Sequence, residues 1–396
     1  MLNKIILFFI YIRQKIFSSN VWILKDILYP FWPVCSHKPH CSEYGKQCFQ
    51  KYDFLTALKY TMERIDKCTP DNKIKYDPSS YKVVYFSSAP IWVPFLEKLV
   101  EDKRFDVVWV VTMPDAPSGR WQKIKENIIA STAKKLWIEN IFKPEKLKNN
   151  EDFIEKINQL DVDFFVVLSY WKILSKKILD IPKLWPINIH WSILPKYRWA
   201  SPIQSVFLNK EKETWITIMY MDEKMDTWDI IKILKFPLNK EDNSKTIIDK
   251  FVEYGPSFFV DTLWDFAKWK LSRKKQDDKN ATYCGKFTKE DGKIDFSLAA
   301  DDIYAKFQAF YLWPGIYSYF NWKQIKFTDI DYDLEENENK KIWEVYKKNN
   351  KIYVKCWKWA IELKKVKIEW KKEMFINDFI NWYKDFLYTV LNKSWK

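Results

Sequence analysis

The chain has 396 residues, of which 47% are hydrophobic and 30% charged. This composition excludes collagen-like, disordered and multi-span membrane proteins, and the length favours two or three domains with sizeable cores. The net charge of +14 suggests a polyanionic partner such as nucleic acid or an anionic membrane surface. Only six of the 66 basic residues are arginine, however, so a bias toward AT-rich codons is a competing explanation of the charge.

The first 80 residues differ from the rest of the chain. Basic residues Lys4, Arg13 and Lys15 flank the apolar run Ile5–Ile12. Eight residues are too few to span a bilayer, so the run indicates an interfacial helix. A signal peptide is the alternative, but no small-residue cleavage site follows. A helical stretch is expected at 52–68.

Four of the six cysteines lie near the N-terminus and two lie late in the chain. This distribution is not that of a secreted disulfide framework, and it favours an intracellular, reduced protein. The N-terminal cysteines and histidines could supply a tetrahedral zinc site, but their irregular spacing favours buried free cysteines and surface histidines. We therefore expect no metal. The residues concerned are Cys35, His37, His40, Cys41, Cys48 and Cys68.

From residue 82 onward the pattern becomes α/β. Short apolar runs indicate buried parallel strands, at 82–86, 105–112, 162–169 and 187–190. Helical stretches alternate with them, at 93–103, 124–137 and 151–160. This alternation predicts a doubly wound, Rossmann-like sheet.

The last third of the chain has a different pattern. A charged stretch at 271–280 separates it from the α/β part, and segments of alternating polarity at 317–330 and 351–369 predict a small antiparallel β-barrel of the OB type. Twelve lysines against three glutamates lie between Lys340 and Lys372, a charge suited to a nucleic-acid backbone or simply to a solvated face. The expected divisions are 1–80, 81–270, a linker at 271–282, and 283–396.

The segment 187–204 (INIHWSILPKYRWASPIQ) contains the one histidine outside the N-terminal cluster. His190 ends a predicted strand, which is where open α/β sheets bind ligands. Asn188 lies two residues earlier and thus on the same face of the strand. An amide can donate to an oxyanion while the imidazole moves a proton. Carboxylates at 222, 226 and 229 could orient the ring.

This segment, followed by TWITIMYMDEKMDTWDII (214–231), closely resembles the signature of the 10-formyltetrahydrofolate-dependent formyltransferases. The resemblance continues through 87–100, 276–297 and the Trp-Pro-Gly segment within 309–327, so it covers nearly all of 82–390. Two features resemble the methionyl-tRNA formyltransferases within that superfamily. These are the loop 112–125, which contains Arg120, Lys123 and Lys125 as expected tRNA contacts, and the basic β-domain.

The resemblance implies a role for each residue of the signature. Asn188 would polarise the formyl carbonyl, His190 would act as general base or proton shuttle, and Asp226 would assist the transfer. Folate contacts are expected along the segment made of Ser192, Ile193, Leu194 and Pro195. The implied co-substrate is 10-formyltetrahydrofolate, and the implied partner is initiator Met-tRNA. We expect a cytoplasmic monomer without a metal.

The N-terminal part resembles the small membrane protein insertion efficiency factor family, through CSEY (41–44), Cys68-Thr-Pro and Tyr76-Asp-Pro. That family is a peripheral partner of the inner-membrane insertion machinery, so contact with that surface through residues 1–80 is expected. Two alternatives remain for the whole chain. One is a formyltransferase for another amine, such as a nucleotide-sugar, and the other is an insertion factor with an inactive formyltransferase fold.

Glycine is scarce and tryptophan abundant, with 6 and 22 residues respectively. Average usage predicts roughly 28 glycines, which equals the two counts together. Several tryptophans stand where the formyltransferase pattern has glycine or another very small residue. We therefore hypothesise that the gene reads UGA as glycine and that the written sequence renders it as tryptophan. These positions are Trp92, Trp109, Trp121, Trp137, Trp171, Trp185, Trp191, Trp199, Trp215, Trp228, Trp357 and Trp359.

Overall fold

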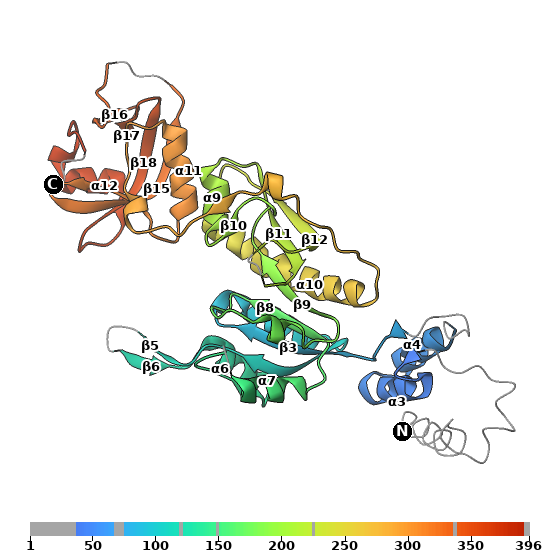
Figure 1. The fold of residues 1–396 in the computed structure, drawn as a ribbon. Helices are drawn as coiled ribbons and strands as arrows, with labels where there is room; N and C mark the ends of the chain where they lie inside the picture. Colours follow the sequence, from blue (N-terminus) through green and yellow to red (C-terminus); the bar gives the residue numbers. More distant parts are fainter. Residues whose placement is uncertain are drawn as a thin grey trace, which may run out of the picture. The chain divides into compact units, whose positions relative to one another are not determined.

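The computed structural model describes residues 37–66, 75–118, 122–147, 150–223, 226–335 and 339–391. These residues form two compact units. The first contains the described part of residues 1–188 together with 220–223 and 256–273, and the second contains the described part of the remainder. Each unit is considered by itself below, with the element labels of Figure 1.

Two helices at the start of the first unit form a small hydrophobic cluster (Figure 1, blue). Helix α3 (Cys41–Lys51) and helix α4 (Phe54–Asp66) pack around the buried side chains of Tyr44, Cys48 and Phe49. The short strands β1 (His37–Lys38) and β2 (Lys75–Tyr76) pair in parallel. The predicted helix at 52–68 corresponds to α4. Helix α3 was not predicted; it contains Gly45 in its interior, a residue that weakens the helical pattern of its sequence.

The first unit is built on a parallel sheet with the strand order β9-β8-β3-β4-β7. Its strands are β3 (Tyr81–Ser87), β4 (Phe105–Val111), β7 (Ile141–Phe142), β8 (Phe164–Leu168) and β9 (Trp185–His190). Every residue of β8 is buried, and so are all but one of β3, as expected of strands covered on both faces. The apolar runs therefore predicted the parallel strands correctly.

Helices connect these strands, and Figure 1 shows α6 and α7 on one side of β3 and β8. The connections are η2 (Pro90–Trp92), α5 (Val93–Glu101), α6 (Ile128–Lys135), α7 (Glu151–Asn158) and α8 (Lys176–Leu179). The prediction of one helix over 124–137 was too long. The Asn127 side chain accepts the Ile129 N–H and caps α6 there. The residues before it form β6 (Lys123–Lys125), which pairs with β5 (Ala116–Ser118).

The second unit begins with Ile189 and His190, the last two residues of β9, and continues through the segment after them. Its elements here are β10 (Arg198–Trp199), α9 (Pro202–Leu208), β11 (Glu213–Tyr220), β12 (Ile230–Pro237) and the first half of α10 (Ser244–Ala267). Strands β11 and β12 are antiparallel, with Glu213 opposite Pro237. Strand β10 pairs in parallel with β13 (Tyr283–Cys284), so the chain that leaves the predicted linker lies beside the loop after His190.

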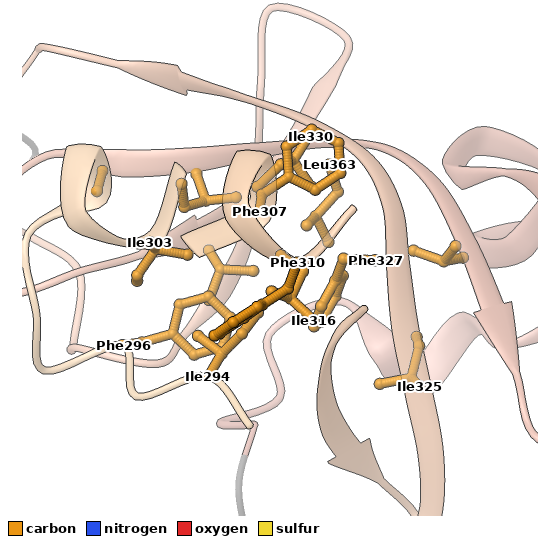
Figure 2. Close-up of a cluster of buried hydrophobic side chains, with 14 of the residues drawn as sticks. Ile294, Phe296, Ile303, Phe307, Phe310, Ile316, Ile325, Phe327, Ile330 and Leu363 are labelled. Carbon is orange, nitrogen blue, oxygen red and sulfur yellow. The ribbon is translucent and has the colours of Figure 1, made fainter. Parts of the chain in front are cut away.

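An antiparallel sheet of six strands forms the C-terminal part of the second unit, in the order β14-β15-β18-β17-β16 with β19 on β18. Its core contains Phe296, Phe310 and Phe327 (Figure 2), and the same core includes Val206 and Phe207 of α9. The elements are η3 (Asp278–Asn280), η4 (Glu290–Gly292), α11 (Ala300–Phe310), β14 (Ile316–Phe320), β15 (Lys323–Asp333), β16 (Val345–Lys348), β17 (Lys351–Lys355), β18 (Ala360–Ile368), β19 (Met374–Phe375), α12 (Ile376–Trp382) and η5 (Lys384–Phe386).

The predicted fold class is confirmed: a Rossmann-like parallel sheet, a small antiparallel β-domain and a short helical N-terminal part. The exact domain boundaries stay a prediction. Among the described residues, no helix has both the length and the apolar character needed to cross a membrane. The apolar run at 5–12 lies outside the described residues.

Candidate active site

His190 is the last residue of β9 and is buried, with 8% of its surface exposed. Its Nε2 lies 2.9 Å from the carbonyl oxygen of Tyr197. A carbonyl oxygen only accepts, so Nε2 carries the hydrogen in the neutral ring. The other ring nitrogen, Nδ1, then holds the lone pair that can take up a proton.

Asp226 faces this second ring nitrogen. Its Oδ1 lies 3.8 Å from His190 Nδ1, and its Oδ2 accepts the backbone N–H of Trp199 at 2.9 Å. The distance to the ring is too long for a direct hydrogen bond, and it leaves the carboxylate facing the nitrogen that holds the lone pair. Of the three carboxylates left open by the sequence, the structure thus brings Asp226 to the histidine.

A buried polar network holds the loop that contains Asp226. Gln276 Nε2 donates to the carbonyl oxygens of Asp226, at 3.1 Å, and Trp228, at 2.7 Å. Gln276 Oε1 accepts from Nη2 of Arg198 at 2.9 Å, and the same guanidinium nitrogen donates to Asp278 Oδ1 at 2.7 Å. The network therefore joins the loop after His190 to the loop of Asp226.

Arg198 is 1% exposed. Its burial lowers the pKa of the guanidinium, whereas the hydrogen bonds to Asp278 and Tyr283 raise that pKa by more. The charge is thus retained in the interior by its partners. No role was predicted from the sequence for Arg198, Gln276 or Asp278. Their signal was their place in the two segments that resemble the formyltransferase pattern, 187–204 and 276–297.

The segment of predicted folate contacts forms a tight turn after His190. Ser192 Oγ donates to the carbonyl of Lys196 at 2.8 Å, and the Lys196 N–H donates to the carbonyl of Ile193 at 2.7 Å. Thr217 Oγ1 of β11 donates to the carbonyl of Ser192 at 2.8 Å. Leu194 is buried, and the bond between Leu194 and Pro195 is cis. The turn is therefore fixed from both sides by its own chain and by β11.

Asn188 lies two residues before His190 in β9 and belongs to the first unit. Its Nδ2 donates to the carbonyl oxygen of Val167 at 2.7 Å. An amide nitrogen carries two hydrogens, so this bond uses one of them and fixes the direction of the other. The structure thus gives Asn188 a defined orientation within its own unit, while His190, Asp226 and Ser192 lie together in the second unit.

Two of the three residues predicted to contact tRNA, Lys123 and Lys125, lie on the hairpin of β5 and β6. Lys123 and Lys125 are exposed on β6, opposite Ser118 and Ala116 respectively. Arg120 lies outside the described residues. The hairpin therefore presents two ammonium groups to solvent, as a phosphate-contacting loop requires.

Several lysines of the C-terminal sheet form ion pairs with carboxylates, so fewer of them can contact nucleic acid than their number suggests. Lys340 pairs with Glu344 at 2.8 Å, Lys351 with Glu362 at 2.9 Å and Lys364 with Asp331 at 3.1 Å. Other lysines of the same stretch are exposed, namely Lys347, Lys358, Lys367, Lys371 and Lys372. The net positive charge at this surface is carried by such exposed residues.

The cysteines and histidines near the N-terminus do not gather around one point within the described residues. Cys48 is buried, which raises the pKa of its thiol to about 11, and His37 is buried while His40 is exposed. Across the described residues, no three His, Cys, Asp or Glu side chains are grouped so as to hold a metal ion. Cys35 and Cys68 lie outside these residues.

Comparison with known proteins identifies the family. The formyl transferase family profile matches residues 81–263, and the profile of the formyl transferase C-terminal domain matches residues 286–384. A methionyl-tRNA formyltransferase of Caldicellulosiruptor saccharolyticus is 35% identical over 306 residues, which cover 76% of this chain and 97% of that protein. The chain belongs to the formyl transferase family. Another relative, the methionyl-tRNA formyltransferase of Caldanaerobacter subterraneus, is 33% identical over 299 residues and is covered to 96%.

Solved structures similar to this formyltransferase share its fold. The sugar 3N-formyl transferase WlaRD, solved with dTDP and 5-N-formyl-THF, aligns with a TM-score of 0.52 and 19% identity over 74% of this chain and 99% of WlaRD. An N-formyltransferase from Helicobacter canadensis, in complex with folinic acid and dTDP-3-aminofucose, aligns with a TM-score of 0.53 and 18% identity over 72% of this chain and 98% of its own.

The formyltransferase is preceded by a second family match. The profile of the membrane protein insertion efficiency factor family matches residues 12–80. Of this range, the structure describes 37–66 and 75–80, which contain α3 and α4. The predicted resemblance of the N-terminal part is thus confirmed at the level of the family.

Proposed function

We propose that this formyltransferase transfers the formyl group of 10-formyltetrahydrofolate to the α-amine of methionine on initiator tRNA. The observation that carries the proposal is the buried His190, whose Nδ1 can accept a proton beside the Asp226 carboxylate. Formyl transfer to an amine needs a proton acceptor and an oxyanion donor, and it needs no covalent enzyme intermediate.

The reaction follows from these groups. The amine nitrogen attacks the formyl carbon, a C–N bond forms, and the carbonyl electrons move onto oxygen, where the Asn188 amide donates a hydrogen bond. His190 Nδ1 takes the proton of the amine, and Asp226 stabilises the resulting imidazolium. When the bond to the folate nitrogen breaks, that nitrogen takes up the proton and tetrahydrofolate leaves. The turn from Ser192 to Pro195 would contact the folate.

The choice of acceptor rests on two supports. The relatives that the chain matches over 97% and 96% of their length are named methionyl-tRNA formyltransferases. The exposed Lys123 and Lys125 provide positive charge for an acceptor-stem backbone. Solved neighbours named as sugar formyltransferases make an amino-sugar nucleotide the alternative acceptor.

A paired acceptor assay tests the proposal. The purified protein and 10-formyltetrahydrofolate are incubated either with initiator Met-tRNA or with an amino-sugar nucleotide. We expect formylmethionyl-tRNA and no formylated sugar, and we expect His190→Ala to reduce the rate by at least about 10²-fold. The matched control is His40→Ala, which changes an exposed histidine of the N-terminal part. Formylation of the sugar alone, or of neither acceptor by folded protein, would contradict the proposal.

The N-terminal part suggests a second role. We infer that residues 1–80 bring the enzyme to the inner membrane, where the insertion efficiency factor family assists the insertion of membrane proteins. The family match to residues 12–80 and the basic residues Lys4, Arg13 and Lys15 beside an apolar run support this inference. The chain should sediment with anionic vesicles, and a variant with all three basic residues changed to glutamate should not. Equal sedimentation of both would contradict it.

A further inference from the structure

Tryptophan occupies an unusual share of the left-handed backbone positions. Among the described residues, seven of the seventeen non-glycine residues with positive φ are tryptophan, although tryptophan makes up only 22 of the 396 residues. A large side chain is disfavoured in this conformation because its Cβ approaches the following carbonyl, whereas glycine adopts it freely. The seven residues are Trp137, Trp199, Trp269, Trp322, Trp343, Trp359 and Trp370.

Two of these residues end helices in the motif that favours glycine. Trp137 follows α6 with φ 60°, and its N–H donates to the Lys134 carbonyl while the next N–H, of Ile138, donates to Ala133. Trp269 follows α10 with φ 59° and makes the same pair of bonds. Its N–H donates to the Phe266 carbonyl, and the next N–H, of Lys270, donates to the Asp265 carbonyl. This pattern is the Schellman motif, whose left-handed residue is usually glycine.

A third lies in a two-residue hairpin between β14 and β15. Phe320 pairs with Lys323, so Asn321 and Trp322 form the turn, with φ 44° and 66°. Both φ angles are positive, as in the type I′ turn, for which Asn-Gly is the strongly preferred sequence. The hairpin between β16 and β17 has the same geometry with Asn349 and Asn350, at 47° and 60°. The chain thus uses ordinary turn residues in one hairpin and an indole in the other.

Two further tryptophans do not fit their surroundings for a separate reason. The indole Nε1 atoms of Trp215 and Trp228 are buried and have no hydrogen-bond partner within the part of the chain that the structure describes. A buried indole N–H normally finds an acceptor. Both positions are among those where the sequence analysis expected glycine or another very small residue, and a residue without a side-chain donor would leave nothing unsatisfied.

Residue 199 connects this anomaly to catalysis. Its φ is 85°, and in that conformation its N–H holds Asp226 Oδ2 at 2.9 Å, while Asp226 Oδ1 faces His190. The indole itself is 51% exposed and lies 4.7 Å from the Tyr283 ring, between ring centroids. What positions the carboxylate is therefore the backbone N–H of residue 199, which glycine would supply equally well.

We propose that the functional protein carries glycine at the seven left-handed tryptophan positions, because its gene encodes them with UGA read as glycine. Of these glycines, the one at 199 is the residue whose N–H positions Asp226 for catalysis. The part that concerns residue 199 rests on the proposed function. The part that concerns the backbone rests on the dihedral angles and hydrogen bonds alone.

The first test is peptide mass spectrometry of the protein isolated from its native cell. Peptides that cover residues 137, 199 and 322 should have the masses of the glycine forms. Peptides that cover Trp264, or Trp313 of the Trp-Pro-Gly segment that resembles the family, should retain tryptophan. The Trp264 ring lies 6.0 Å from the Tyr81 ring, between centroids, and Lys268 lies over its face, so its indole takes part in packing. Tryptophan at 137, 199 and 322 in the native peptides would overturn the proposal.

The second test compares three recombinant chains: the sequence as written, a form with glycine at all seven positions, and a form with alanine there. Alanine removes the indole but keeps the Cβ, so the glycine chain should have the highest Tm if backbone conformation is the reason. An alanine chain as stable as the glycine chain would overturn the backbone argument. Melting needs no substrate, so this outcome is independent of the proposed function.

The third test concerns residue 199. Restoring tryptophan there in the seven-glycine chain should lower kcat by at least about tenfold and change KM less, because the loss concerns the placing of a proton-transfer group. Restoring tryptophan at 322 is the matched control and should leave kcat unchanged. An equal kcat with glycine and with tryptophan at position 199 would overturn the role of this residue. No formylation by any of the chains would instead contradict the proposed function.

Discussion

At the scale of single residues, the candidate site depends on the direction of two side chains. The Tyr197 carbonyl determines which nitrogen of His190 carries the hydrogen, and Nδ1 is thereby directed to Asp226. The carboxylate in turn is held by one backbone N–H, that of residue 199. Because each group has a single defined orientation, a substitution that keeps the shape of a side chain should distinguish the effect of its charge from the effect of its position.

Asp226→Asn tests the charge. The amide oxygen can still accept the N–H of residue 199, but the imidazolium formed at His190 loses its carboxylate partner. We expect kcat for formyl transfer to fall by about 10²-fold with a small change in KM. Asp222→Asn removes a carboxylate four residues earlier in the sequence and is the control. An unchanged kcat in Asp226→Asn would show that the carboxylate does not act on the ring.

Gln276→Leu tests the network behind the loop. Leucine has a similar size but leaves the carbonyls of Asp226 and Trp228 and the buried Arg198 without their amide partner. Each buried group left without a bond costs about 1–3 kcal/mol, so urea unfolding should show a loss in that range or above. Lys279→Leu, at an exposed position three residues later, should cost little. A neutral Gln276→Leu would contradict the network.

At the scale of helices and strands, the sequence predicted the parallel strands because their apolar runs need no tertiary information. It failed where ends are decided by single side chains. Helix α6 begins after the cap of Asn127 and not at 124. Helix α3 contains Gly45 in its interior, which weakens the helical signal of its sequence. Of the candidate site, the sequence likewise predicted some residues and not others. His190 follows from its strand end, whereas the contact of Gln276 with the loop of Asp226 joins residues fifty apart and has no local signal.

The hairpin between β16 and β17 allows the strain of a left-handed tryptophan to be measured directly. Asn350 has φ 60° in the turn between β16 and β17, as Trp322 has 66° between β14 and β15. Asn350→Trp should therefore destabilise the fold, by about 1–2 kcal/mol, while Asn350→Gly should be neutral or stabilising. Thermal melting of both variants checks this. A tryptophan at 350 that leaves Tm unchanged would show that the fold tolerates such positions.

At the scale of the whole molecule, the seven strained positions add up. Five of them lie in the second unit, and at about 1–2 kcal/mol each they sum to about 5–10 kcal/mol, which approaches the total stability of a typical domain, about 5–15 kcal/mol. The sequence as written should therefore be far less stable than the glycine form. The composition indicated this anomaly, but the number and place of the affected residues required backbone angles. Trp269, Trp322, Trp343 and Trp370 were not among the positions identified from the sequence.

One ion-pair cluster ties separate segments of the second unit together and should make its stability depend on pH. Burial alone would raise the pKa of Asp331, but Lys240 and Lys364 lower it from 3.8 to about 2. Asp331 Oδ1 lies 2.8 Å from Lys240 Nζ, and its Oδ2 lies 3.1 Å from Lys364 Nζ. Since the folded-state pKa is the lower one, this stabilisation is present above the unfolded value of 3.8 and is lost as the pH falls toward about 2.

Asp331→Asn should accordingly cost on the order of 1–2 kcal/mol at pH 7, and the difference from the parent protein should shrink as the pH falls below 3.8. Denaturant unfolding at pH 7, 4 and 3 measures this. Asp378→Asn, on an exposed part of α12, is the control and should show no such dependence. A loss that stays constant from pH 7 to 3 would contradict the assignment to this ion pair.

The most direct test of the whole account is a single-turnover formylation of initiator Met-tRNA by the seven-glycine chain with 10-formyltetrahydrofolate, beside the same chain with His190→Ala. We predict formylmethionyl-tRNA and tetrahydrofolate in equal amounts from the first chain, and a rate lower by at least about 10²-fold from the second. Folded protein that forms no formylmethionyl-tRNA, or that forms it equally fast without His190, would contradict the account.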